Sequence, residues 1–213
     1  MNLVDALEDE DEEIAKSKRV NGVGIGIVTN NQDPEGMGRV KVKFPWLDEE
    51  AESDWVKVAS MMGGKNRGAM FLPEVEDEVL VAFEQGDVDH PYVLGALWSK
   101  EDKPPGNNED GKNNIRKITS RSGHEIIFND DHEQKKEKLE IHSKSGHVLI
   151  LDDSAGKERI EIRDKTQKNI VRIDSVENII SIEAATKLTI KAPMIEIEAS
   201  GVLTLKGGMI KIN

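Results

Sequence analysis

Two histidines occupy equivalent places in an internal repeat, and they are the side chains best suited to hold a metal ion. The segment 120–130 reads SRSGHEIIFND, and segment 143–153 reads SKSGHVLILDD, so a displacement of 23 residues carries His124 to His147. Imidazoles gathered about a symmetry axis are able to ligate a transition metal. No other ligand-type residue shares this periodicity, and a turn histidine bonded to the backbone is the commoner arrangement. We therefore expect no metal site.

Asp130, Asp131 and Glu133 are acidic residues close together in sequence, as in the carboxylate pairs that hydrolyse glycosides. They lie in a highly charged segment, 129–138, and no aromatic subsite accompanies them. The chain has no cysteine, which excludes disulfides, thiolate catalysis and Cys-based zinc sites. We expect no catalytic residue and no cofactor, with a single-chain β-helix enzyme as one alternative.

The three tryptophans, Trp46, Trp55 and Trp98, could stack on bases or sugars. However, the residues between the first two are mostly acidic, and the formal net charge of the chain is −12. Affinity for phosphate backbones comes largely from Lys and Arg, so no nucleic-acid partner is expected. We favour core or subunit-contact roles for these side chains. An oligonucleotide- or glycan-binding barrel on a β-helical stalk is the alternative function.

Residues 20–98 contain five or six short alternating segments separated by turn-rich stretches, which is typical of a small antiparallel barrel or sandwich. Strands are expected at 23–27, 39–44, 55–58, 69–72, 79–83 and 92–97, with a loop at 63–68. An acidic N-terminal segment, 1–19, precedes this barrel. A linker, 99–116, follows it and has almost no apolar side chain.

The last third of the chain repeats an apolar–polar–apolar pattern, which places both apolar residues of each pair on one face of a strand. The intervals between pairs shorten toward the C-terminus, and the run 171–174 is expected to keep the 23-residue step from Val148. One copy cannot shield such a face, so three copies are expected to wind about a common axis. The fold class is therefore all-β, with 117–213 forming an intertwined trimeric β-helix or prism. Its expected trimer core is Leu139, Ile141, Leu149, Leu151, Ile160, Ile162, Val171, Ile173, Ile180, Ile182, Leu188, Ile190, Ile195, Ile197, Leu203, Leu205, Ile210 and Ile212.

Several separated motifs resemble, in the same order, the oligonucleotide/oligosaccharide-binding (OB) domain of contractile-injection-system spikes. They are GIV at 26–28, DPEGMGRVKVKFPW at 33–46, WVKVA at 55–59, RGAMFLPE at 67–74, DEVLV at 77–81 and FEQGDVDHPYVLG at 83–95. The Ser-Gly-His and Asp-Asp pattern of the repeat is similar to the start of the triple-stranded β-helix in the same family. This family includes phage baseplate assembly protein V and the VgrG spike.

The resemblance implies a structural protein without enzymatic activity: a homotrimeric needle that caps the tube or hub and punctures the target envelope when the sheath contracts. It implies a separate trimeric hub protein at the barrel, since only the acidic segment precedes it, and transient contact with the target envelope. A PAAR-like tip protein is expected to dock on Met209, Ile210, Lys211, Ile212 and Asn213. The sequence begins with acidic residues and has no long apolar run, so we expect assembly in the cytoplasm into a phage tail or tail-like particle.

Overall fold

The computed structural model describes residues 19, 20 and 22–211, and within these it leaves the side chains of residues 48–51 undescribed. Apart from Arg19, the acidic N-terminal segment lies outside the described residues, as do Ile212 and Asn213. The chain divides into two compact units, one ending at Pro104 and the other beginning at Pro105. Among the described residues the single helical element is one 3₁₀ turn, η1 (Glu84–Gly86), so the predicted all-β class is confirmed.

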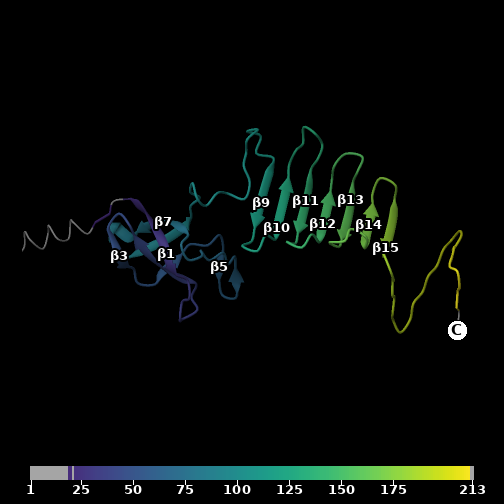
Figure 1. Cartoon of the computed structure of the whole chain (residues 1–213), viewed down its shortest axis with the longest axis horizontal. Helices are drawn as coiled ribbons and strands as arrows, with labels where there is room; N and C mark the ends of the chain where they lie inside the picture. The colour runs from purple at the N-terminus through teal and green to yellow at the C-terminus, as the bar shows by residue number, and fades with distance from the viewer. Residues whose placement is uncertain (1–18, 21, 212–213) are drawn as a thin grey trace, which may run out of the picture. The chain divides into compact units, whose positions relative to one another are not determined.

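The first unit contains a closed five-stranded barrel (Figure 1). Its strands are β1 (Val23–Asn30), β2 (Arg39–Phe44), β4 (Val56–Val58), β7 (Glu78–Phe83) and β8 (Pro91–Ala96). They pair in the order β1-β7-β8-β4-β2, and a further β1–β2 pairing closes the ring. The β4–β8 pair is parallel and the others are antiparallel, while β3 (Asp48–Glu52) extends the sheet beside β2. This is the OB-type barrel that the motifs predict.

The barrel core is built from valines and two phenylalanines, and no core side chain is more than 7% exposed. Strand β1 contributes to it in an unusual way, because its glycines face inward. A Cβ on Gly24 would lie 2.8 Å from the Trp46 ring, and one on Gly26 would lie 3.3 Å from Val81. The aromatic rings occupy the space that side chains on β1 would otherwise fill. As a result Val23 and Ile25 face outward.

Three details of the barrel differ from the sequence-based expectation. Residues 69–72 are not a strand, and the expected loop at 63–68 is a hairpin of β5 (Gly63–Gly64) and β6 (Arg67–Gly68). Strand β3 was not predicted. An alternating pattern indicates which face of a segment is apolar, but a strand also needs a free neighbouring edge. Whether each of these three segments forms a strand therefore depends on its available pairing partner and not on its hydrophobic pattern.

The second unit contains one seven-stranded antiparallel sheet in which neighbours in sequence are neighbours in space (Figure 1). Each strand has five residues. The strands are β9 (Ile115–Thr119), β10 (Glu125–Asn129), β11 (Lys138–His142), β12 (Val148–Asp152), β13 (Arg159–Arg163), β14 (Ile170–Asp174) and β15 (Ile179–Glu183).

The repeat step shortens by one residue at its second occurrence. Val148 lies opposite Arg163, and Arg163 lies opposite Ile170, so the residue equivalent to Val148 is Ile170. The expectation that 171–174 keeps the 23-residue step from Val148 is therefore wrong. Because side chains alternate between faces, this shift places Val171 beside Ile162 and Leu149, on the opposite face from Val148.

Strand structure ends at Glu183, although the apolar pairs continue to Ile210. The four later pairs were expected in strands, and no strand is assigned from 184 to 211 (Figure 1). These pairs recur every seven or eight residues, which leaves only two or three residues for a turn after a five-residue strand. Within one copy, such a segment has no neighbouring strand to supply its hydrogen bonds.

Candidate assembly surface

The registers of β10 to β15 align the aliphatic residues into two continuous columns on one face of the sheet, here called the aliphatic face. The column members that remain exposed have 37–71% of their surface accessible. In a single copy no described segment covers this face. One column is Ile126, Ile141, Leu149, Ile162, Val171 and Ile182, and the other is Phe128, Leu139, Leu151, Ile160, Ile173 and Ile180.

The opposite face of the sheet mixes aliphatic residues such as Ile150 with a network of ion pairs, in which Arg159 Nε and Glu161 Oε1 make no hydrogen bond. Glu161 is 1% exposed at its centre, and Arg172 donates to Glu161 Oε2 through Nε (2.8 Å) and Nη2 (2.7 Å). Arg163 Nη1 lies 3.3 Å from Glu161 Oε1, and Arg159 pairs with Asp152 at 2.9 Å. Charge-assisted bonds of this kind are the stronger ones in proteins. They join β12, β13 and β14 within one chain.

The repeat histidines connect successive turns along one edge of the sheet. The backbone N–H of Lys144 donates to Nδ1 of His124 (3.3 Å), and that of Lys165 donates to Nδ1 of His147 (3.2 Å). Asn169 occupies the third equivalent position, directly before β14, and its Oδ1 accepts from the Ala185 N–H (3.1 Å). A turn histidine bonded to the backbone is what the sequence favoured over a metal ligand. The sequence did not identify Asn169 as the third member, for which the signal is an acceptor side chain directly before each of β10, β12 and β14.

The other candidate chemistries are not assembled in the described part of the chain. It contains no group of three His, Cys, Asp or Glu residues that could hold a metal. Asp130 pairs with Arg116, and Glu133 pairs with Lys112, which lowers the pKa of Glu133. The Gln134 N–H donates to Asp131 Oδ1 (3.1 Å). The three carboxylates thus have three separate partners and do not converge as an acid pair does.

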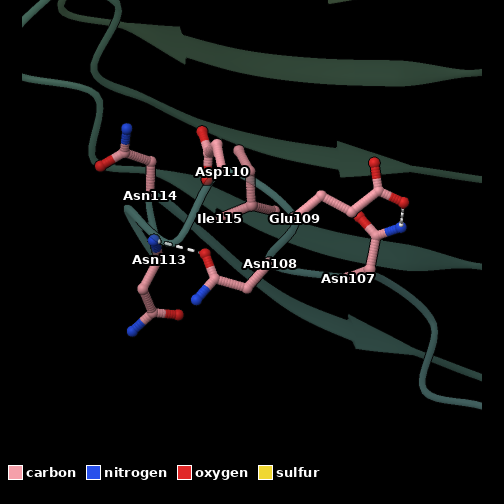
Figure 2. A pocket seen from close by; sticks show the side chains of 7 residues that line it. All are labelled: Asn107, Asn108, Glu109, Asp110, Asn113, Asn114 and Ile115. Atoms are coloured by element: carbon pink, nitrogen blue, oxygen red, sulfur yellow. Dashed lines mark hydrogen bonds between the residues drawn. The ribbon is translucent and has the colours of Figure 1, made fainter.

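A polar hollow of about 290 Å³ lies in the loop before β9, within the predicted linker (Figure 2). Its polar groups bond to one another: Asn108 Oδ1 accepts from the backbone N–H of Asn113 (2.7 Å), and Asn107 Nδ2 donates to Glu109 Oε1 (2.6 Å). Small-molecule sites are mostly apolar with a few convergent polar groups. Of the seven lining residues only Ile115 is apolar, so this hollow does not have that character.

The tryptophans have different surroundings. Trp46 packs on Phe44 and Phe83 and donates from Nε1 to the Ile25 carbonyl (2.8 Å). Trp55 lies under the cationic groups of Arg39 and Lys41, and Trp98 is 72% exposed.

Both cations over Trp55 are compensated by carboxylates. Arg39 Nη2 lies 2.7 Å from Asp33 Oδ1, and hydrogen bonding to Arg39 holds the pKa of Asp33 well below its usual range. Lys41 Nζ lies 2.7 Å from Glu52 Oε1, and hydrogen bonding to Lys41 lowers the pKa of Glu52. Little positive charge is left here for a phosphate backbone.

The eighteen predicted trimer-core residues fall into three groups. Ten lie on the aliphatic face, in β11 to β15. Seven lie in the strandless segment, where each is more than half exposed: Leu188, Ile190, Ile195, Ile197, Leu203, Leu205 and Ile210. Ile212 lies outside the described residues. Of the predicted tip-docking residues, Met209, Ile210 and Lys211 are exposed, and Ile212 and Asn213 lie outside the description.

Sequence comparison identifies the barrel. Residues 24–98 match the family described as the type VI secretion system/phage-baseplate injector OB domain. The chain is 45% identical over 73 residues to the type VI secretion system spike protein VgrG5 of Pseudomonas aeruginosa, covering 32% of this chain and 9% of VgrG5. It is 37% identical over 95 residues to VgrG3 of Vibrio cholerae, covering 41% of this chain and 9% of that relative.

The longest of the reported alignments reaches past the barrel. It joins the chain to the spike protein VgrG4b of P. aeruginosa, 34% identical over 137 residues, covering 52% of this chain and 16% of VgrG4b. The chain therefore spans less than a fifth of the length of these curated relatives. The resemblance to spikes of contractile injection systems is confirmed.

No helix among the described residues is long and apolar enough to cross a membrane.

Proposed function

We propose that this relative of the VgrG spikes is the central spike of a contractile tail or injection particle, a homotrimer whose second unit forms a needle. The aliphatic face carries the proposal. Two six-residue columns of Ile, Leu, Val and Phe stand in register on one side of a single-layer sheet, while the other side carries ion pairs centred on Glu161. A sheet must bury its hydrophobic face against another layer.

Three copies arranged with these faces toward a common axis would supply that layer. Burying one such side chain contributes roughly 1.5–3 kcal/mol relative to leaving it exposed, before ordering entropy is subtracted. Burial of the twelve column residues of each chain would therefore stabilise a threefold prism strongly, before the entropy cost is counted. In such a prism the Glu161 network lies on the outside, where mixed charge keeps the needle soluble.

The strandless segment 184–211 fits the same arrangement. Its Ile and Leu side chains are more than half exposed, and it has no strand partner among the described residues of its own chain. Neighbouring copies would provide those hydrogen bonds if the three segments wound around one another. The later pairs recur at a shorter interval than the strands before them, which suits an intertwined segment that makes no hairpins.

The proposed mechanism is passive. Sheath contraction drives a stiff needle through the target envelope, and neither turnover nor a cofactor takes part. The injector OB domain would sit on a separate trimeric hub, and the C-terminal end would carry a PAAR-like tip protein. Assembly would take place in the cytoplasm before the particle acts.

The deciding experiment is light scattering of the purified full chain. A trimer has three times the 23.7 kDa mass of one copy, and a mass near that value is expected across a wide concentration range. A well-folded particle with the mass of one chain would refute the spike. Docking of a PAAR-like protein is tested separately by mixing it with the wild-type trimer and with Met209→Asp, which should lose the interaction while remaining trimeric.

A further inference from the structure

The barrel carries an exposed apolar projection, here called the arm, formed by residues 60–71. All residues from Met61 to Gly68 are exposed, even though they include the paired strands β5 and β6. Figure 1 shows β5 beside the barrel. Met61 and Met70 are more than 80% exposed, Phe71 is 66% exposed, and Met62 is 54% exposed. Large apolar side chains gathered on one projection are typical of a contact surface.

The arm is held in shape by bonds at its base. The Ser60 hydroxyl bonds to the carbonyls of Ala69 (2.6 Å) and Met62 (3.1 Å), and the Ala69 N–H donates to the Met62 carbonyl (3.0 Å). Gly68 has φ +155°, and a Cβ there would lie 2.7 Å from the Met62 carbonyl oxygen. The methionines are therefore presented by a closed hairpin, so less ordering entropy is lost when they bind.

A second apolar surface lies on the outside of the same barrel and follows from the inward-facing glycines of β1. Val23 and Ile25 face outward there, and Ile25 lies opposite Leu80 of β7. Tyr92 and Leu94 of β8 are also exposed beside β7. These five residues, Val23, Ile25, Leu80, Tyr92 and Leu94, are called the outer patch.

The charges around the two surfaces offer an ion pair between them. The arm tip carries Lys65 and Arg67, and both are exposed. The border of the outer patch carries both signs of charge: Glu84 is exposed and accepts from the Tyr92 hydroxyl (2.8 Å), and Glu78 lies opposite Ile27, while Lys57 lies opposite Tyr92 and Lys43 lies opposite Ile27. The exposed Glu84 is the carboxylate that a basic arm tip would meet beside Tyr92.

We propose that the arm of one copy docks on the outer patch of the next copy around the threefold axis. The proposal rests on the trimer proposed above and adds the barrel contact that sets its register. A contact between two different surfaces of identical chains is heterologous, and such contacts close into rings when the rotation allows. Methionine adapts to irregular apolar surfaces and makes favourable contacts with rings such as Tyr92. The chain itself supplies both halves of the interface.

The absence of cysteine from the sequence allows a direct test by paired thiols in the full chain. Met70→Cys combined with Leu94→Cys is treated with a short bis-maleimide, whose two ends each add one thiol. The expected product is a covalent trimer on a denaturing gel. Met70→Cys combined with Met37→Cys is the matched control, since Met37 is an exposed methionine outside the outer patch, and it should give no covalent trimer.

A second readout uses Leu94→Cys alone. Its thiol should react with a mono-maleimide at least tenfold more slowly in the native trimer than after Met70→Asp is added, whereas Met37→Asp should leave the rate unchanged. Equal rates would contradict docking of the arm.

The outcomes separate this inference from the proposed function. A trimer by light scattering without covalent trimers leaves the spike standing and refutes the arm contact. A cross-link within one chain would mean that the arm folds onto its own barrel, and protection of the Leu94→Cys thiol only when a hub protein is added would assign the outer patch to the hub. Either result overturns the inference. A particle of one-chain mass overturns both proposals.

Discussion

The two units of this chain use the same aliphatic residue types and reach opposite results. In the barrel, nine apolar side chains are buried to 7% exposure or less. In the seven-stranded sheet, Ile150 is the one apolar residue of the described set that reaches such burial, and it lies on the polar face. Alternation of apolar and polar residues alone thus does not indicate whether a chain completes its own core. The core is complete where the sheet closes into a barrel.

The physical difference is the extra strand pairing. The β1–β2 pair joins the two ends of the barrel sheet, so its inner face is enclosed and its strands have neighbours on both sides. The sheet of the second unit runs from β9 to β15 without such a pairing and remains a single layer. Within one copy its stability comes from its backbone hydrogen bonds and its ion pairs, without a closed apolar core.

A charge on the aliphatic face should have the largest effect of any single substitution. Ile182→Asp places a carboxylate on this face at a position that is 54% exposed in one copy. A lone chain would tolerate it, whereas in the assembly an unpaired buried charge costs about 3–5 kcal/mol per chain. Light scattering should show loss of the trimer.

The control for that substitution is the adjacent residue on the other face. Ser181→Asp adds the same charge opposite Arg172, where an ion pair with the guanidinium can form. It should leave the trimer mass unchanged. Equal behaviour of Ile182→Asp and Ser181→Asp would mean that the aliphatic face is not an interface.

Truncation of a core side chain should separate the two units by concentration dependence. Val81→Ala in the barrel, at a position with no exposed surface, should cost about 1–3 kcal/mol at any protein concentration. Ile162→Ala removes a side chain that is half exposed in one copy but would be buried in the trimer. Its cost in thermal unfolding should grow as the protein is diluted, because association is linked to stability. An Ile162→Ala cost that is independent of concentration would contradict this.

A methyl group inside the barrel should be tolerated less well than one elsewhere in the same unit. Gly24→Ala forces a Cβ to within 2.8 Å of the Trp46 ring, and overpacking of this kind costs about 1–3 kcal/mol. Gly95→Ala meets no atom within 4 Å and needs no positive φ, so it should be neutral or stabilise by about 0.4–1 kcal/mol. Chemical denaturation of the two variants measures the contrast. A destabilisation by Gly24→Ala no larger than that by Gly95→Ala would contradict the inward orientation of the β1 glycines.

The sequence predicted well what depends on local alternation. The strands at Arg39–Phe44 and Glu78–Phe83, the aliphatic face and the all-β class follow from period-two patterning and turn residues. The OB barrel followed from motif order. These are features in which each residue's face is determined by its neighbours in sequence.

The remaining features depend on contacts that are remote in sequence. The orientation of β1 is set by Trp46, which fills the space above Gly24, and alternation of Gly with Val and Ile does not indicate which set faces inward. Hairpin β5–β6 and strand β3 depend on which edges are free. The one-residue shift at Ile170 depends on the length of a turn. The acceptor role of His124 and His147 depends on turns stacking along the sheet edge, which the repeat suggested only indirectly.

That acceptor role gives the smallest expected effect and tests the sheet edge independently of assembly. His147→Ala leaves the Lys165 N–H without its acceptor and should destabilise the sheet by about 0.5–1.5 kcal/mol, the net contribution of one hydrogen bond. His147→Asn should recover most of this loss, because Asn169 already accepts a backbone N–H at the equivalent position of the next turn. Hydrogen exchange at the Lys165 amide measures both variants, with faster exchange expected in His147→Ala alone. If both exchange at the wild-type rate, the imidazole does not join the turns, and the repeated Ser-Gly-His sequence must serve the backbone conformation of the turn itself.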